Sequence, residues 1–107
     1  LLCAYGSVYT GANIENASYS MTICAERTAF SKAILEGKRD FKGIAIVSTD
    51  KNGVIDMACI PCGACLQFMS EFCRDDFEFY IKQGSQCKTL YLKDLFPKTF
   101  KLKEDQQ

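Results

Sequence analysis

The chain has 107 residues, of which 48% are hydrophobic and 24% charged, and this fits one compact domain over residues 1–107. Thirteen basic residues balance thirteen acidic ones, which disfavours a nucleic-acid polymer or an anionic membrane as partner. The apolar stretches are far shorter than the roughly 18 residues that span a bilayer, and no secretory signal is recognisable, so we expect a cytoplasmic protein.

Hydrophobic periodicity and turn residues predict alternating strands and helices. In chain order, the predicted elements are a strand at 7–10, an irregular connection over 11–20, a helix over 22–35 closed by Gly37, a buried strand at 43–48, a turn at 50–53, a helix from Pro61 to about Arg74, and short strands at 77–81 and 89–92. This order predicts a layered α/β domain whose mixed or mostly parallel sheet is covered by helices.

The chain contains seven cysteines and no histidine. An odd number of cysteines without a secretion signal fits reduced thiols better than a disulfide framework, and we expect some of them to bind metal. Without histidine there is no imidazole ligand and no nucleophile–histidine pair. Acid–base chemistry near neutral pH must then come from a carboxylate, a cysteine, a lysine or metal-bound water.

Three of the cysteines fall where helices are predicted to begin. Cys62 and Cys65, in the run PCGAC, share one face of a helix start about 60° apart, and Cys24 opens the other helix in the run TICAERTA. The positive end of a helix lowers thiol pKa values and favours the thiolates that zinc requires. Glu26 follows Cys24 by two residues, so both can address one metal only if Cys24 points off the helix end.

The number of ligands separates two kinds of zinc site. Three protein ligands leave the fourth position open for catalysis, whereas Cys59, which forms a second CxxC pair with Cys62, could close a structural site of four cysteines. Three thiolates also over-neutralise Zn²⁺, and Arg27 could hydrogen-bond the sulfurs and withdraw charge. The alternative role for Arg27 is a surface ion pair on its helix.

Four segments together resemble the cytidine deaminase family, in its small, homotetrameric branch with three cysteine ligands. These segments are NIENASY at 13–19, TICAERTA at 22–29, PCGAC at 61–65 and LFPKTF at 95–100. The zinc deaminase signature is a ligand followed by x-Glu and later by PCxxC. The resemblance implies a three-layer α/β/α sandwich with a central mixed sheet and one zinc ion per chain. It also implies that family members carry about one helix, the start of the first strand and a pocket-lining phenylalanine ahead of the point that matches Leu1.

The resemblance implies hydrolysis of cytidine, and of deoxycytidine, to the uridine nucleoside and ammonia in pyrimidine salvage. Cys24, Cys62 and Cys65 resemble the zinc ligands. Glu26 resembles the proton shuttle that serves the zinc-activated water attacking C4 of the pyrimidine. The backbone N–H of Ala25 resembles the donor to the base carbonyl.

Other matching positions resemble substrate-binding residues. Asn13 and Glu15 resemble the ribose readers, although on their own they would read as a turn-forming polar pair. Tyr19 and Phe100 resemble aromatic groups supplied to a neighbouring subunit's pocket, although Phe100 alone would be an ordinary hydrophobic anchor. Gln67 is expected to support the metal site, with surface hydrogen bonding as its alternative.

Two rival functions stay open at this point. A deaminase of a modified cytosine nucleoside such as blasticidin S would share zinc and fold but need another sugar pocket. A non-catalytic, zinc-stabilised interaction domain would need four cysteines rather than three and a glutamate. The other cysteines, Cys3, Cys59, Cys73 and Cys87, are expected to pack as small hydrophobes.

Overall fold

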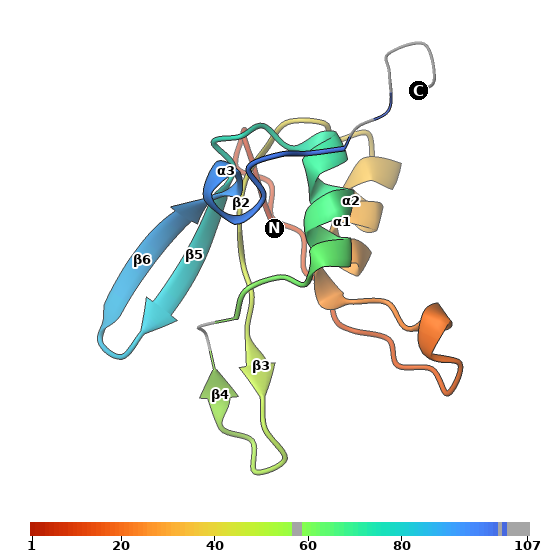
Figure 1. Ribbon diagram of the computed structural model, residues 1–107, viewed down its shortest axis with the longest axis vertical. Coiled ribbons are helices and arrows are strands. Elements are labelled where there is room, and N and C mark those ends of the chain that lie inside the picture. Colours follow the sequence, from red (N-terminus) through yellow and green to blue (C-terminus); the bar gives the residue numbers. More distant parts are fainter. Residues whose placement is uncertain (57–58, 101, 103–107) are drawn as a thin grey trace.

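The computed structural model of the chain describes residues 1–56, 59–100 and 102. Its centre is a four-stranded sheet in the order β1-β2-β5-β6 (Figure 1). The strands are β1 (Leu2–Cys3), β2 (Phe41–Ala45), β5 (Glu78–Gln83) and β6 (Gln86–Tyr91). Strand β2 runs parallel to β5, whereas the β1–β2 and β5–β6 pairs are antiparallel. The sheet is therefore mixed, as predicted.

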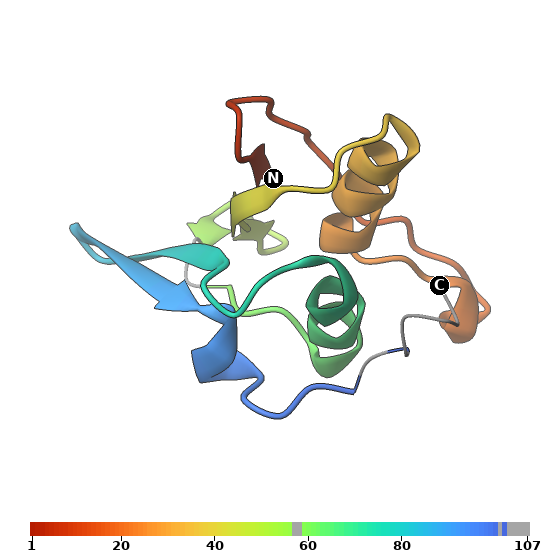
Figure 2. The ribbon, with the colours of Figure 1, turned by 90° about the horizontal axis from the view of Figure 1, so that it is seen from above.

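Two helices of similar length lie side by side on one face of this sheet (Figures 1 and 2). The helical elements are η1 (Tyr19–Met21, a 3₁₀ turn), α1 (Ala25–Leu35), α2 (Gly63–Phe72) and α3 (Leu92–Leu95). A separate hairpin of β3 (Ser48–Thr49) and β4 (Ile55–Asp56) extends beyond the end of β2. The α/β class expected from the sequence is confirmed.

Local sequence explains where α1 begins and ends. Cys24 has an extended backbone and forms the N-cap, and Glu26 places a negative charge in the first turn, where the helix dipole favours it. At the other end Gly37 has a φ of 88°, which glycine adopts without strain, and its N–H donates to the carbonyl of Ile34. The helix is thus held between a cysteine and a glycine.

An aromatic core fixes both helices on the sheet. Phe30 of α1 lies 5.9 Å from the ring of Phe77, and Phe77 meets Phe79 of β5 edge to face at 5.3 Å. All three side chains are buried, as is Met69 of α2. Each such side chain contributes about 1.5–3 kcal/mol through burial, so this cluster anchors the helix N-termini that carry the cysteines.

Several predicted boundaries are wrong, and local turns explain most of the differences. The strand predicted at 7–10 is only a single bridge between Val8 and Leu2, because a turn at Gly6 brings this segment back onto β1. The helix predicted from 22 begins at Ala25, because Ile23 pairs with Ile14 in extended conformation. The helix predicted from Pro61 begins at Gly63. The strand predicted at 43–48 is β2, which spans residues 41–45. The strand predicted at 89–92 covers the end of β6 and the first residue of α3. The turn at 50–53 is confirmed.

The four remaining cysteines divide into two pairs. Cys3 and Cys73 are buried and pack as small hydrophobes, as predicted. Cys87 is exposed on β6 and Cys59 is only partly buried, so the prediction is wrong for Cys87 and incomplete for Cys59. Among the described residues, no helix has the length and apolar character needed to cross a bilayer.

Candidate metal centre and active site

The N-termini of α1 and α2 bring three thiols together. Cys24 is the N-cap of α1, Cys62 is the N-cap of α2, and Cys65 lies one turn further along α2. Their sulfur atoms all lie within 4.8 Å of one another. Thiolates bound at about 2.3 Å to one tetrahedral zinc ion lie about 3.8 Å apart, so small side-chain adjustments suffice to hold zinc. The three cysteines form a group fit for one zinc ion.

The electrostatics of the two α2 thiols differ. Backbone N–H groups of Cys65 and Ala64 point at the sulfur of Cys62 and lower its pKa, as expected at a helix N-terminus. Burial raises the pKa of Cys65, and hydrogen bonding to Cys24 and the negative charge of Glu26 raise it further. A cation bound beside Cys65 would offset this increase and favour its thiolate, and Zn²⁺ supplies such a charge.

Arg27 lies against the same sulfurs. Its Nη2 is 3.8 Å from the sulfur of Cys24 and 3.3 Å from the carbonyl oxygen of Thr22. Hydrogen bonds to Cys24 and Cys65 raise the pKa of the guanidinium. Its buried Nε has no hydrogen-bond partner in the described part of the chain. The guanidinium is thus aimed at the thiol group, where a positive charge offsets the excess negative charge of three thiolates.

Cys59 lies outside the thiol group. Its S–H lies 3.1 Å from Oγ of Ser48, in the hairpin, and it is not a member of the cluster that Cys24, Cys62 and Cys65 form. The described cysteines therefore bring three thiols together rather than four. A site with three protein ligands keeps a coordination position open.

Glu26 is a buried carboxylate beside these thiols, with 8% of its surface exposed. It lines a hollow of about 190 Å³ between the start of α1, the loop ahead of it and the end of β2. The lining residues are Leu1, Val8, Tyr9, Thr10, Gly11, Ala25, Glu26, Ala29, Ile44, Ala45, Ile46 and Val47. The apolar wall made by Val8 and residues 44–47 could not be predicted as part of a site, because such apolar runs are equally typical of a buried core.

The polar pair Asn13 and Glu15 lies on the segment that leads toward α1. Nδ2 of Asn13 donates to Oε1 of Glu15 at 2.8 Å, and both side chains are exposed. Between them, Ile14 pairs through its backbone with Ile23, next to Cys24. The alternation expected of an extended segment therefore places both polar side chains together, tied to the start of the metal-binding helix.

The two aromatic residues implied by the resemblance point into solvent. Tyr19, in η1, is 90% exposed and Phe100 is 77% exposed. Nε2 of Gln67 donates to the backbone carbonyl of Phe100 at 2.6 Å, so this amide holds the C-terminal segment against α2. The described part of the chain therefore leaves most of the surface of both side chains uncovered.

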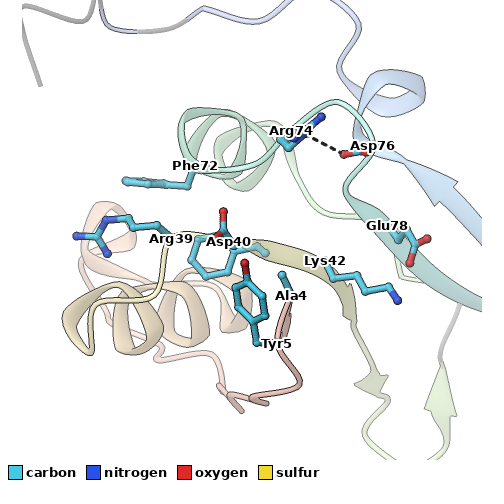
Figure 3. Close-up of a pocket in the computed structure, with 10 residues that line it drawn as sticks. Ala4, Tyr5, Arg39, Asp40, Lys42, Phe72, Arg74, Asp76 and Glu78 are labelled. Atoms are coloured by element: carbon cyan, nitrogen blue, oxygen red, sulfur yellow. Dashed lines mark ion pairs between the residues drawn. The ribbon is translucent and has the colours of Figure 1, made fainter.

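A wider hollow lies at the other end of the helices (Figure 3). It lies next to the C-terminus of α2 and the segment that follows α1, whereas the thiol group lies at the two N-termini. Its charged side chains are three basic and three acidic, namely Arg39, Lys42, Arg74, Asp40, Asp76 and Glu78. Because these charges balance and no thiol is present, this hollow is not a candidate for the metal site.

Comparison with known proteins agrees with this site. The model of the cytidine and deoxycytidylate deaminase zinc-binding region matches residues 1–81. The chain is 49% identical over 81 residues to a cytidine deaminase from Sporosarcina psychrophila, covering 76% of this chain and 56% of that protein. It is 53% identical over 78 residues to a probable cytidine deaminase from Dictyostelium discoideum, covering 73% and 49%.

A solved structure extends the likeness to the fold. The crystal structure of cytidine deaminase from Burkholderia pseudomallei superposes with a TM-score of 0.79 at 35% identity, covering 94% of this chain and 77% of that one. The chain spans about half the length of the curated relatives it matches.

Fold and site together define an α/β protein with a group of three cysteine thiols fit for one zinc ion. The chain belongs to the cytidine and deoxycytidylate deaminase family.

Proposed function

We propose that this protein is a zinc-dependent cytidine deaminase that converts cytidine and deoxycytidine, with water, to uridine or deoxyuridine and ammonia, in pyrimidine salvage. The observation that carries this proposal is the buried carboxylate of Glu26 beside a three-thiol group. A purely structural zinc site does not require a buried carboxylate next to its ligands, whereas hydrolysis requires a group that transfers protons at this position.

Under this proposal the thiolates of Cys24, Cys62 and Cys65 bind one zinc ion. When bound, the zinc ion supplies the Lewis acidity that activates a water molecule at the open position. Glu26 would accept one proton from that water and deliver it to N3 of the base. It would then take the second proton from the hydroxyl group formed at C4 and pass it to the leaving amine, so the carboxylate is restored at the end of each turnover. The N–H of Ala25 belongs to the unpaired first turn of α1 and donates to the carbonyl oxygen of the base. Arg27 stabilises the ligand sulfurs.

The side chains of Asn13 and Glu15 bind the sugar hydroxyl groups. Their mutual hydrogen bond fixes the carboxylate and the amide side by side, and a carboxylate with a neighbouring amide can accept from and donate to adjacent hydroxyl groups. Gln67 contributes at the edge of the site by holding the backbone at Phe100.

We further propose a cytoplasmic homotetramer with shared active sites. The hollow beside Glu26, at about 190 Å³, is smaller than the roughly 300–1,000 Å³ of typical small-molecule sites, so further walls are needed. Tyr19 and Phe100 are exposed aromatic groups that can form such walls in a neighbouring copy. Within the described part of the chain the cysteines form no disulfide bond, which suits a reducing compartment.

An ultraviolet assay of the purified protein with cytidine, deoxycytidine and blasticidin S, combined with zinc analysis, tests the function. We expect turnover of both pyrimidine nucleosides and one zinc ion per chain. Turnover of blasticidin S alone would assign the protein to the modified-nucleoside alternative. A zinc-loaded protein without any turnover would support an interaction domain.

Ligand variants test the metal site separately from activity. Replacing Cys24, Cys62 or Cys65 by alanine should abolish stoichiometric zinc, whereas Cys59→Ala should retain it, because the thiol of Cys59 lies on Ser48. Full zinc content in Cys24→Ala, together with its loss in Cys59→Ala, would instead establish the closed four-cysteine site.

The shared site can be tested by mixing two inactive variants, Glu26→Gln and Phe100→Ala. If Phe100 acts in a neighbouring copy, subunit exchange creates some sites with both residues intact, and part of the activity returns. If it acts within its own chain, every site keeps one lesion. Light scattering should show about four protomers. An absence of recovery after verified exchange, with Phe100→Ala alone clearly impaired, would contradict the shared site.

A further inference from the structure

The segment that carries Asn13 and Glu15 is tied to the metal-binding helix at alternate residues. We call residues 12–16 the reader segment. Its backbone bonds come from Ala12, Ile14 and Asn16, and each is made to the stretch 22–28 that contains Cys24 and Glu26. Because alternate residues of an extended segment face opposite sides, these anchors leave the side chains of residues 13 and 15 free for a ligand.

Thr28 provides the anchor at one end. Its Oγ1 accepts a hydrogen bond from the N–H of Ala12 at 3.1 Å. The same hydroxyl lies 2.9 Å from the carbonyl oxygen of Ala12 and 2.8 Å from that of Ala25, either of which can take its single proton. The hydroxyl therefore bridges the reader segment and the first turn of α1.

Gly11 allows the close approach on which this anchor depends. A Cβ atom at Gly11 would lie 2.5 Å from the carbonyl oxygen of Ala25 and 2.6 Å from both the backbone nitrogen of Ala29 and Oγ1 of Thr28. Two of these three atoms belong to the helix backbone and cannot move aside. The backbone ahead of the reader segment thus packs directly on α1.

Thr22 provides the anchor at the other end. Its Oγ1 accepts from the N–H of Asn16 at 3.1 Å, and Ile14 and Ile23 exchange backbone hydrogen bonds of 2.8 and 2.9 Å between the two anchors. Two threonines that flank Cys24 and Glu26 in the sequence therefore hold both ends of the reader segment. The only trace of this role in the sequence is the presence of two hydroxyl residues in the run TICAERTA.

We propose that Thr22 and Thr28 are positioning residues that fix the sugar-reading pair relative to the metal centre and so set the selectivity for sugar hydroxyl groups. The proposal rests on the function proposed above. Neither hydroxyl needs to touch the substrate. Both act through the backbone of the reader segment, which must hold its two polar side chains within hydrogen-bonding distance of a sugar while the base lies at Glu26.

The test compares Thr28→Val, Thr28→Ser and, as a matched control, Thr89→Val on the exposed strand β6. Valine keeps the shape of threonine but leaves the N–H of Ala12 without its partner, whereas serine keeps the hydroxyl. The readouts are kcat and KM for cytidine and for 2′,3′-dideoxycytidine, which lacks the 2′ and 3′ hydroxyl groups of the sugar. Zinc content and amide hydrogen exchange across residues 12–16 are measured as well.

In Thr28→Val we expect faster exchange at Ala12, normal zinc, a kcat close to that of the unmodified protein and a KM for cytidine about five- to tenfold higher. The preference for cytidine over the dideoxy substrate should fall by the same factor, because the dideoxy compound gains nothing from the reader pair. Thr28→Ser should restore the preference, and Thr89→Val should leave it unchanged. A merely structural role would lower turnover of both substrates equally.

Other outcomes separate the failure of this proposal from the failure of the function. An unchanged preference in Thr28→Val, in a protein that deaminates cytidine, would overturn the positioning role. An unmodified protein that turns over no cytosine nucleoside would instead overturn the proposed function, and the sugar-reading role with it. Should Thr28→Val not fold, Thr22→Val must show the same loss of preference, and its failure to do so refutes the proposal.

Discussion

Replacing Glu26 by glutamine removes one negative charge and one proton acceptor while preserving the size of the side chain. The carboxylate is 8% exposed and lines the hollow beside the thiol group, so no solvent carboxylate can readily take its place. A general base contributes about 10²- to 10⁴-fold, which corresponds to about 3–5 kcal/mol of transition-state stabilisation. We expect kcat to fall within this range.

The zinc content of Glu26→Gln, unlike its kcat, should not fall. The charge of Glu26 is one of the causes that raise the pKa of Cys65, so its removal should lower the pKa of that thiol and favour the thiolate. Glu26→Gln should therefore bind zinc at least as well as the unmodified protein, and the two readouts together separate loss of catalysis from loss of the metal.

The assay measures nucleoside turnover, zinc per chain and thermal unfolding for Glu26→Gln and for Asp75→Asn. The control residue is exposed between α2 and β5, beyond the C-terminus of α2 and so at the opposite end of that helix from Cys62. We expect it to keep its activity. Turnover of Glu26→Gln within about threefold of the unmodified protein, with zinc retained, would refute a proton-transfer role, since even the weakest general bases contribute about 10²-fold.

Two further predictions concern stability. Gly11→Ala places a Cβ atom 2.5 Å from the carbonyl oxygen of Ala25 and should lower the free energy of unfolding, measured in urea, by about 1–3 kcal/mol. The control Gly63→Ala should leave the free energy of unfolding unchanged, because its Cβ atom would meet no atom within 4 Å. Equal effects of the two substitutions would contradict the close packing at Gly11. Burial and the hydrogen bond to Glu78 raise the pKa of Tyr80 to about 12, against about 10 in the unfolded chain. The unfolded state therefore loses its proton first, so stability should decline between about pH 10 and 12, and Tyr80→Phe should flatten this decline in urea titrations; an unchanged slope would contradict the shift.

The local chemistry of the metal site could be predicted from the sequence. The cysteine spacing at 62 and 65, the helix starts and the adjacent glutamate are short-range features, and each depends only on residues within one turn of helix. The chain also has no histidine, so imidazole ligands are excluded. For these reasons the sequence predicts Cys24, Cys62 and Cys65 as one ligand group, and the structure brings their sulfurs within 4.8 Å of one another.

Boundaries between elements could not be predicted as well, because they depend on contacts between distant residues. Ile23 has a helical pattern on its own but stays extended because Ile14 pairs with it. The 7–10 segment alternates like a strand, yet the turn at Gly6 leaves Val8 with a single bridge. Tertiary pairing overrides local propensity at such positions.

By itself the sequence determined the α/β class, the three thiols that come together and the carboxylate beside them, because periodicity, helix polarity and ligand chemistry act over a few residues. Only the tertiary structure decided that Cys59 stays outside the thiol group, that Gln67 holds the backbone at Phe100, and that Thr28 ties residue 12 to α1. Each of these contacts joins residues 11 to 33 positions apart, and their distances depend on how the helices pack on the sheet rather than on any local pattern.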